Sequence, residues 1–256
     1  MIKITFLGTG TSQGIPVIGS DHPVSFSDDL KDKRLRSSIL IEYKDFNFVI
    51  DCGPDFRQQM LKTNCRKLDA IIFTHEHADH TTGIDDVRPY FFRQGKIPIY
   101  LHERVLNSLH NRFAYIFDPK QKYPGAPDFE VNLITKENDF QILGLNITPI
   151  EAVHYKLPVL GFRLGKFAYL TDVKTISDKE MLKLNGLDAL VINALRYESH
   201  PSHLNIEEAL EIVNQVKPKQ TFFTHISHNM GFHEEVCSNL PKSVSLAFDG
   251  LVLEVD

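Results

Sequence analysis

The 256-residue chain is poor in cysteine and has no excess of basic residues, and each shortage excludes a class of protein. Its three cysteines, Cys52, Cys65 and Cys237, are odd in number and far apart, which suits a reducing cytoplasm better than a disulfide scaffold. Lys and Arg number 28 against 33 Asp and Glu, a formal charge of −5. Without clustered cations, tight binding of long nucleic acid is disfavoured.

Long apolar runs are also missing. The N-terminal residues Met1–Phe6 are typical of a strand, not of a signal peptide, and no segment approaches the length of a membrane span. Apolar residues make up 42% and charged residues 24%, as in an ordinary globular protein. No repeat or linker divides the chain, so we expect a single cytoplasmic domain over residues 1–256 that does not enter a membrane.

Short β-rich runs alternate with helical patterns, which predicts an α/β fold of two mixed sheets with helices. Strands are expected at Ile2–Leu7, Ser38–Tyr43, Phe46–Ile50, Ala70–Phe73, Ile97–Leu101, Asn146–Val153, Val159–Leu164, Phe167–Leu170, Ala189–Ile192, Thr221–Phe223 and Ser245–Val255. Helices are expected at Pro54–Leu61, Glu103–His110, Ser177–Leu184 and Ile206–Val216. Asp249-Gly250 should turn the last strand back on itself, and the proline-rich stretch Asp118–Asp128 should form a loop.

Histidine is the abundant chemical residue, with 12 in the chain. The strongest pattern is Thr74-His75-Glu76-His77-Ala78-Asp79-His80, which directly follows the predicted strand Ala70–Phe73. Three imidazoles and a carboxylate leaving a rigid strand can converge on two adjacent ions, and these ligands suit Zn²⁺, Mn²⁺ or Fe. The alternative, a solvated polar turn, gives the three histidines no reason to gather.

Other strand ends supply the partners that such a site needs. His154, Asp172 and His225 each stand where an apolar strand reaches the rim of a predicted sheet. Taken alone, each residue is more typical of a satisfied core or turn position. Together with the histidine cluster they become candidate ligands, and one carboxylate could bridge two ions.

With these residues the sequence resembles the metallo-β-lactamase superfamily, whose signature is this His-x-His-x-Asp-His loop and whose fold is a four-layer αββα sandwich. The resemblance covers nearly the whole chain. It implies two divalent ions, one held by His75, His77 and His154 and the other by Asp79, His80 and His225, with Asp172 bridging them. No cysteine stands at these positions, so the drug-hydrolysing branch with a cysteine ligand fits less well.

The opening Gly8-Thr9-Gly10-Thr11-Ser12-Gln13-Gly14-Ile15-Pro16 resembles the phosphodiesterase branch, which includes phosphoribosyl cyclic-phosphate phosphodiesterases and tRNA 3′-processing endonucleases. Its glycines could bring backbone amides to an anion, or could simply form a tight turn. In this branch a histidine outside the metal set assists catalysis. The matching residue is His203, and His200 is its rival.

One part of the pattern departs from the family. Relatives often hold an accessory structural zinc with three cysteines, at positions that correspond here to Ser20, His22 and Ser25, together with a later histidine, His228. Neutral serine is a poor zinc ligand, so the sequence favours surface or supporting roles for the two histidines over an accessory zinc.

Three further residues are candidates near the site. Arg88 and Arg196 could hold phosphate oxygens with their planar forks, although an ordinary surface ion pair is the alternative for each. Asp51, which ends the predicted strand Phe46–Ile50, is expected to orient a ligand histidine.

The function predicted from the sequence is a dinuclear phosphodiesterase in which metal-activated hydroxide attacks a small phosphodiester, such as a cyclic sugar phosphate or a nucleotide. Asp79, Asp172 and His203 are the expected catalytic residues. The alternatives are a tRNA 3′-processing-type endonuclease, a hydrolase of a thioester or lactone, and a relative that acts in quinone-cofactor biosynthesis. The resemblance also implies a homodimer.

Overall fold

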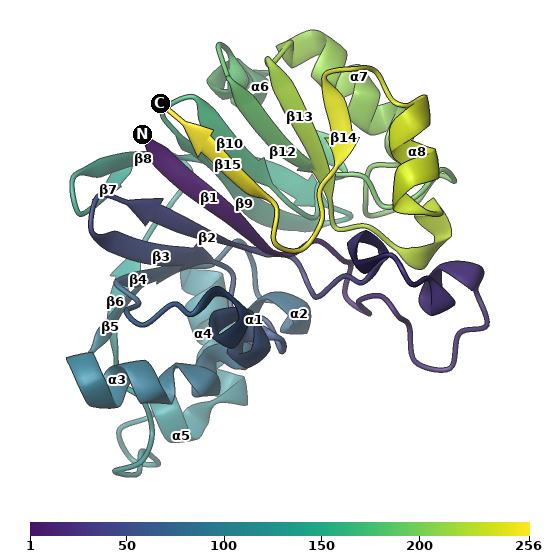
Figure 1. Ribbon diagram of the computed structural model, residues 1–256. Coiled ribbons are helices and arrows are strands. Elements are labelled where there is room, and N and C mark those ends of the chain that lie inside the picture. The colour runs from purple at the N-terminus through teal and green to yellow at the C-terminus, as the bar shows by residue number, and fades with distance from the viewer.

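Two mixed β-sheets lie face to face in the computed structural model, which describes residues 1–256 (Figure 1). The first sheet has the strand order β15-β1-β2-β3-β4-β5-β6, and the second has the order β11-β8-β9-β10-β12-β13-β14, with β7 paired to β8. The strands of the first sheet are β1 (Ile2–Gly8), β2 (Ser38–Tyr43), β3 (Phe46–Ile50), β4 (Ala70–Ile72), β5 (Ile97–Leu101), β6 (Phe129–Leu133) and β15 (Val252–Val255). Those of the second are β7 (Phe140–Ile142), β8 (Leu145–His154), β9 (Leu157–Leu164), β10 (Phe167–Leu170), β11 (Thr175–Ile176), β12 (Ala189–Asn193), β13 (Gln220–Thr224) and β14 (Val244–Leu246).

Helices cover the outer face of each sheet. Along the first sheet run α1 (Phe56–Thr63), α2 (Ala78–Thr81), α3 (Arg88–Gln94), α4 (Glu103–Arg112) and α5 (Ala114–Phe117), and along the second run α6 (Asp178–Met181), α7 (Ile206–Val216) and α8 (His233–Asn239). Short 3₁₀ turns occupy Pro23–Phe26, Leu30–Asp32, Thr82–Val87, Leu182–Leu184 and His228–Met230. This is the predicted four-layer sandwich.

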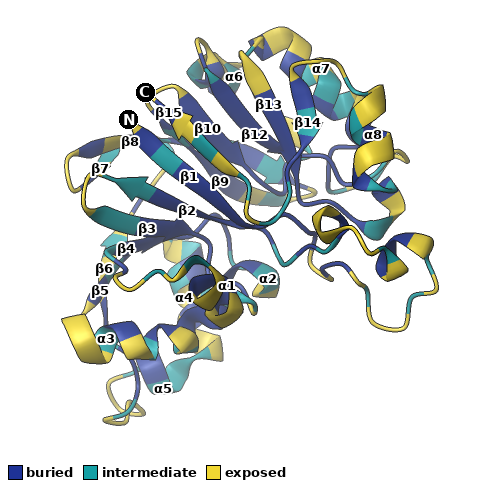
Figure 2. Cartoon of the chain, viewed as in Figure 1, coloured by how far each residue is buried: buried dark blue, intermediate teal, exposed yellow.

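Successive side chains of a strand point to opposite faces of its sheet, so each sheet packs on the other sheet with one face and on helices with the other. In β1, Ile4 and Phe6 point into a cluster that fills the space between the sheets, whereas Leu7 joins the cluster under α1. On the opposite side, Ala209 and Val213 of α7 pack on the outer face of the second sheet. Most strands are therefore dark blue in Figure 2, while exposed residues concentrate on the helices and turns.

The predicted elements are largely present, but the hairpin expected at Asp249-Gly250 is wrong. β14 pairs in parallel with β13 in the second sheet, whereas β15 crosses to the first sheet and pairs antiparallel with β1. The stretch Ser245–Val255 therefore joins the two sheets instead of folding onto itself. The loop expected at Asp118–Asp128 lies between α5 and β6.

Local sequence explains where α7 begins and ends. Asn205 and Glu208 form a reciprocal capping box at its start, and Lys217 adopts a left-handed conformation at its end. No helix of the chain combines the length and apolar character needed to span a membrane.

Candidate metal centre

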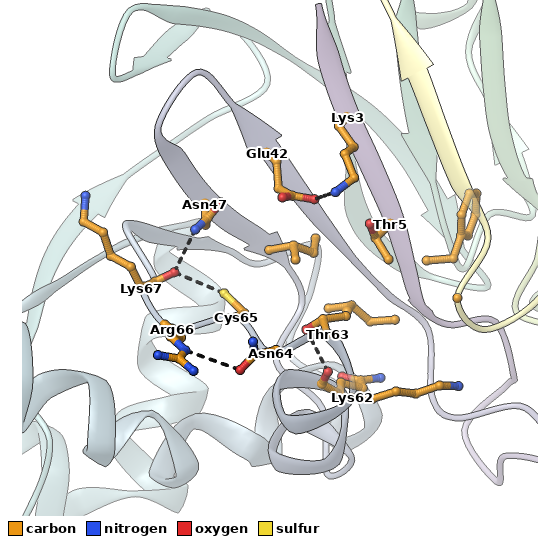
Figure 3. A pocket seen from close by; sticks show the side chains of 15 residues that line it. Lys3, Thr5, Glu42, Asn47, Lys62, Thr63, Asn64, Cys65, Arg66 and Lys67 are labelled. Atoms are coloured by element: carbon orange, nitrogen blue, oxygen red, sulfur yellow. Dashed lines mark hydrogen bonds and ion pairs between the residues drawn. The ribbon is translucent and has the colours of Figure 1, made fainter.

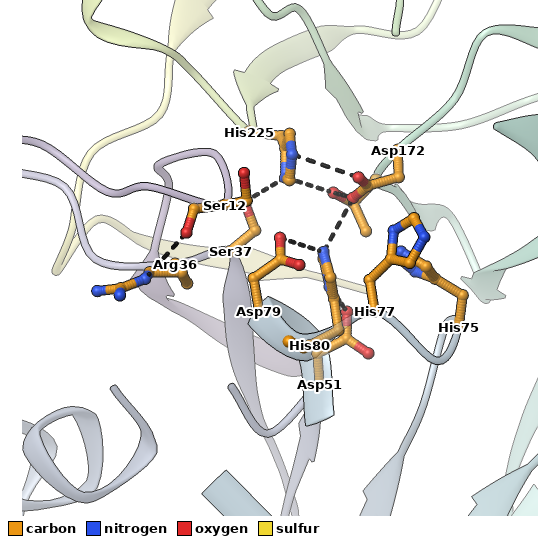
Figure 4. Close-up of polar contacts among 12 residues, drawn as sticks. Ser12, Arg36, Ser37, Asp51, His75, His77, Asp79, His80, Asp172 and His225 are labelled. Atoms are coloured by element: carbon orange, nitrogen blue, oxygen red, sulfur yellow. Dashed lines mark hydrogen bonds and ion pairs between the residues drawn. The ribbon is translucent and has the colours of Figure 1, made fainter. Parts of the chain in front are cut away.

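Five strands from both sheets deliver polar residues to one rim of the sandwich. In the first sheet, Asp51 follows β3 and His75 follows β4; in the second, His154 ends β8, Asp172 follows β10 and His225 follows β13. Because these strands point the same way, their carboxyl ends meet at the rim, as the close-up in Figure 4 shows.

The segment made of the loop after β4 and of α2 carries four of the predicted ligands, two in the loop and two in the helix, and is held at several points. The Thr81 hydroxyl donates to the backbone oxygen of His77 at 2.7 Å, and Arg112 donates to the backbone oxygen of Glu76 at 2.9 Å. The Glu76 carboxylate accepts from Arg104 Nε at 2.7 Å. The signature loop is thus tied to α4, outside the sheet.

Asp172 stands at the centre of the cluster (Figure 4). Its Oδ2 lies 3.1 Å from His80 Nε2, and its Oδ1 lies 3.3 Å from His225 Nε2. His80 Nε2 is also 3.1 Å from Asp79 Oδ2. These contacts lie on one half of the predicted site, and on the other half the ligand atoms of His75 and of His154 each lie within 4.8 Å of an Asp172 oxygen, so one carboxylate reaches both halves, as a bridging ligand must.

The remaining predicted ligands form a second group beside it. The ring centroids of His75 and His77 are 4.6 Å apart, and that of His154 lies 5.1 Å from His77 and 5.9 Å from His75. Ligand atoms of His75, His80 and Asp172 lie within 4.8 Å of one another, as do those of Asp79, His80 and His225. The structure thus brings together all seven residues predicted as ligands.

Hydrogen bonds at Nδ1 leave Nε2 free on the buried histidines. His80 Nδ1 donates to Asp51 Oδ2 at 2.7 Å, His154 Nδ1 donates to the backbone oxygen of Ser202 at 2.8 Å, and His75 Nδ1 contacts the Thr74 hydroxyl at 3.0 Å. That hydroxyl donates to Asp51, so it accepts from His75. Each Nε2 then presents a lone pair to the cluster.

His225 follows the same rule. Its Nδ1 lies 3.3 Å from both the Ser37 and the Thr171 hydroxyl, and both hydroxyls donate elsewhere, so either can accept the imidazole proton. His75 Nε2 is buried without a hydrogen-bond partner, and His80 Nε2 is buried facing the carboxylates of Asp79 and Asp172. Lone pairs that face carboxylate oxygens in a buried site call for a cation, so these residues fit divalent metal ions.

The electrostatics agree with this fit. Burial alone would lower the pKa of His80, but Asp79, Asp172 and Asp51 outweigh it and raise that pKa well above the usual value. Burial would likewise raise the pKa of Asp172, yet His225 and His80 hold it well below the usual range. The cluster therefore attracts positive charge and keeps its central carboxyl ionised.

The backbone is strained where the site residues leave their strands. Asp51, Asp172 and His225 have φ values of 68°, 59° and 56°, in the left-handed region that non-glycine residues seldom adopt. Asn193 stabilises one of these turns, because its side chain accepts from the Val173 amide at 2.6 Å and donates to the Val173 oxygen at 3.1 Å.

Of the two histidines proposed to assist catalysis, His203 lies in the cluster. Its ring centroid is 4.5 Å from that of His154 and 4.9 Å from that of His225, and its Nδ1 lies 3.8 Å from Asp172 Oδ1. Burial and the neighbouring His225 lower the pKa of His203 to about 3. His200 is more exposed, and its Nδ1 contacts the backbone amide and hydroxyl of Ser202.

The two candidate arginines are both engaged in ion pairs. Arg88 at the start of α3 pairs with Asp85, and Arg196 Nε lies 3.6 Å from Glu198 Oε2. Neither arginine lines the pocket beside the histidines.

The departures at Ser20, His22 and Ser25 leave a different arrangement. The His22 and His228 rings meet edge to face at 5.2 Å, and His22 Nδ1 accepts from the backbone amide of Val24 at 3.4 Å. The two histidines do not belong to any group of three metal-binding side chains.

The glycine-rich opening Gly8–Pro16 packs its backbone closely against the backbone of neighbouring segments. The amides of Gly10, Thr11 and Gly14 donate to the backbone oxygens of Leu35, Ile226 and Thr11, respectively. Those three amides are therefore committed within the chain, and the tight-turn alternative describes this segment better than an anion cradle.

A pocket of about 600 Å³ opens beside the histidines, and sequence reasoning missed most of its lining. It is lined by His77, His154, Tyr155, Lys156, Leu157, Pro201 and Ser202. The available signal was the two-residue connection Tyr155-Lys156, which directly follows the predicted ligand His154.

Another pocket, of about 530 Å³, lies on the outer face of the first sheet next to the end of α1 (Figure 3). Lys3 and Glu42 form an ion pair of 2.7 Å at its edge, and Asn64 and Lys67 come from the segment after α1. None of the seven predicted ligands lines it, so it is separate from the metal centre.

Comparison with known proteins identifies the family. The model described as Beta-lactamase superfamily domain matches residues 46–226, which include all seven predicted ligands. The crystal structure described as that of a new diphosphatase from the PhnP family superposes with a TM-score of 0.92 and 39% sequence identity, covering 98% of this chain and 96% of that chain. The chain belongs to the metallo-β-lactamase superfamily.

Two curated relatives refine this assignment. A protein of Porphyromonas gingivalis named octanoyltransferase is 37% identical over 257 residues, covering 100% of this chain and 52% of that protein. The chain thus spans about half the length of this relative. A ribonuclease Z of Bradyrhizobium diazoefficiens is 34% identical over 86 residues, covering 33% of this chain and 23% of that protein. Within the superfamily, the chain lies in the branch of PhnP-family and ribonuclease Z proteins, and these similarities support a metal-dependent hydrolase.

Proposed function

We propose that the chain is a dinuclear metal-dependent phosphodiesterase that hydrolyses a small phosphodiester or a diphosphate. The cluster around Asp172 carries the proposal, because its imidazoles turn free Nε2 atoms toward two carboxylates. The similarity to a PhnP-family diphosphatase over almost the whole chain favours a phosphoryl substrate over other substrates of hydrolases.

The proposed ligands divide between the two sheets. One ion would be held by His75, His77 and His154, the other by Asp79, His80 and His225, and both by Asp172. When bound, a pair of divalent cations supplies hydroxide at neutral pH and neutralises charge on phosphoryl oxygens. Ligand type accommodates Zn²⁺, Mn²⁺ or Fe, so the metal is an outcome of the assay below.

His203 is the proposed non-ligand catalytic residue. It packs between His154 and His225, and its Nδ1 is buried without a hydrogen-bond partner. A neutral imidazole held at the edge of the cluster can donate a hydrogen bond to the oxygen that leaves phosphorus. Arg88 and Arg196 stay predictions as phosphate contacts, because each is paired with a carboxylate and neither lines the pocket beside the histidines.

The test compares metal-loaded wild-type protein with Asp172→Asn, His203→Gln and the matched control His200→Gln, using bis(p-nitrophenyl) phosphate and ADP-ribose as substrates. We expect Asp172→Asn to lose metal and activity together. His203→Gln should keep both ions and lose roughly 100-fold or more in kcat, whereas His200→Gln should stay near wild type. A wild-type protein that holds two ions and cleaves neither substrate would refute the proposal.

An acyl substrate is the second candidate. It is favoured by the relative named octanoyltransferase, although this chain matches about half of that protein. The same variants should therefore be assayed for hydrolysis of octanoyl-CoA and a lactone, and a precursor tRNA should be included for the endonuclease alternative. Activity on one of these without phosphodiesterase activity would replace the first proposal. A homodimer and a cytoplasmic location stay predictions from the sequence.

A further inference from the structure

The turn Tyr155-Lys156 is the two-residue hairpin connection that points to the metal centre. Such connections also join β2 to β3, β7 to β8 and β9 to β10, at Lys44-Asp45, Leu143-Gly144 and Gly165-Lys166. Those three lie at the rim where β3, β8 and β10 begin. Because β8 ends at His154, the turn that follows it projects from the same rim as the metal ligands.

Tyr155 places an aromatic ring at the mouth of the 600 Å³ pocket. The residue is 62% exposed and follows His154 directly, so the pocket joins the ring to the ligand histidines without an intervening element. Pro201 and Ser202 line the same pocket. A flat ring of a substrate can stack on an exposed aromatic side chain because every such ring offers a π-face.

Lys156 supplies a positive charge at the same place. No carboxylate lies within 4.0 Å of it, and its Nζ sits 5.3 Å from the centroid of the Tyr155 ring. Arg104 and Arg196 near the site are paired instead with Glu76 and Glu198, respectively. Lys156 is thus a cation of the pocket that is free to meet an anion.

We propose that the Tyr155-Lys156 turn determines substrate specificity by binding a nucleoside diphosphate derivative, with the base stacked on Tyr155 and the phosphate that is not attacked paired with Lys156 Nζ. Lys156 Nζ lies over one face of the Tyr155 ring, so the base would stack on the other face. The proposal rests on the proposed function, since the metal centre would take the phosphate that reacts.

Three substrates separate the two contacts. Methyl p-nitrophenyl phosphate has neither a base nor a second phosphate, thymidine 5′-(p-nitrophenyl phosphate) adds a base, and ADP-ribose adds both. Tyr155→Ala should raise KM about ten-fold for the two substrates with a base and leave the methyl ester unchanged. Lys156→Ala should raise KM about ten-fold for ADP-ribose alone. Tyr155→Phe and Lys156→Arg should keep most of the wild-type behaviour.

The chain offers matched controls. Lys44 also stands in a two-residue turn with its Nζ 5.0 Å from a tyrosine ring, but at the opposite rim, and Phe92 is 60% exposed on α3. Lys44→Ala and Phe92→Ala should leave KM unchanged for all three substrates. Wild-type metal content and wild-type turnover of the methyl ester show that the pocket variants are folded.

Equal effects of a pocket variant on all three substrates, or no effect on any, would overturn the proposal. If the wild-type protein cleaves none of them, the proposed function fails, and the turn is then tested by calorimetry with α,β-methylene-ADP, which is not hydrolysed. Binding that weakens about ten-fold in Tyr155→Ala and Lys156→Ala but not in Lys44→Ala would support the turn as a nucleotide site. Absent binding, or binding that the two variants leave unchanged, would overturn it.

Discussion

Replacement of Asp51 by asparagine is expected to weaken metal binding although Asp51 is not a ligand. The carboxyl is fully buried, and Oδ2 accepts from His80 Nδ1 at 2.7 Å while Oδ1 accepts from the Thr74 amide at 2.9 Å. In the asparagine variant the amide oxygen can keep the Thr74 contact. The amide NH₂ group then faces His80 Nδ1, which already carries a proton.

The two donors cannot face each other, so His80 must move its proton to Nε2. That nitrogen is the one directed at Asp79 and Asp172, and once protonated it cannot hold a metal ion. Loss of an outer hydrogen-bond partner of a ligand histidine costs 10- to 100-fold in metal affinity, or about 1.4 to 2.7 kcal/mol. The effect should concern the ion next to His80 and spare the other.

The assay is a competition titration with a chelator, combined with elemental analysis after dialysis. Asp51→Asn should retain one tightly held ion and lose the other at concentrations that saturate wild type. Asp55→Asn is the matched control, because Asp55 also stands in the connection between β3 and α1 but accepts from Arg36 and contacts no histidine. Binding of both ions by Asp51→Asn with wild-type affinity would refute the assignment of His80 Nε2 as the ligand atom.

Three other outcomes are expected. Asn193→Ala should lower the free energy of unfolding by about 1 to 3 kcal/mol in urea titrations, because it leaves the buried amide of Val173 unpaired, whereas the Val173 oxygen keeps the Leu204 amide as a donor; an unchanged free energy of unfolding would contradict this. Burial and Arg34 lower the pKa of His233 to about 4, below its unfolded value of about 6.5. The stability that neutral His233 contributes is therefore present above pH 6.5 and is lost as the pH falls toward 4. The difference between the urea midpoints of wild type and His233→Asn should therefore change between pH 6.5 and 4 and be constant outside that range. Chelation should lower Tm, since an ion at 1,000 times its Kd stabilises the folded state by about 4 kcal/mol, and an unchanged Tm would contradict the binding of ions by the folded protein.

Local pattern was enough to predict the elements that carry the site. Ser38–Tyr43, Phe46–Ile50 and Ile206–Val216 have the same bounds in the structure as in the prediction, because each combines a clear period with a marked end. Since predicted ligands follow strands, their convergence could be expected before the sheet order was known. The contact of Asp51 with His80 could be expected for the same reason.

What could not be predicted depends on pairing between distant segments. After β14 the chain leaves the second sheet, and β15 pairs with the free edge of β1 in the first. Nothing near Asp249-Gly250 encodes a partner about 250 residues away. β6 was missed although Phe129-Glu130-Val131-Asn132-Leu133 alternates, because this edge strand follows the proline-rich loop and exposes Val131 and Leu133. The position of Tyr155-Lys156 beside the predicted ligands depends on the direction of β8, which only the assembled sheet gives.

The glycine-rich opening shows how the two sheets are held together at the metal centre. Gly10 forms bridges with both Arg36, which precedes β2, and Ile226, which follows β13. A Cβ on Gly8 would lie 2.0 Å from the Arg36 backbone oxygen, so only glycine permits this approach. Ligands from the first sheet, such as His75, and from the second, such as His225, can share a site only if the rims are fixed relative to each other. We therefore expect a side chain at Gly8 to shift the rims and so to change the spacing of the predicted ligands.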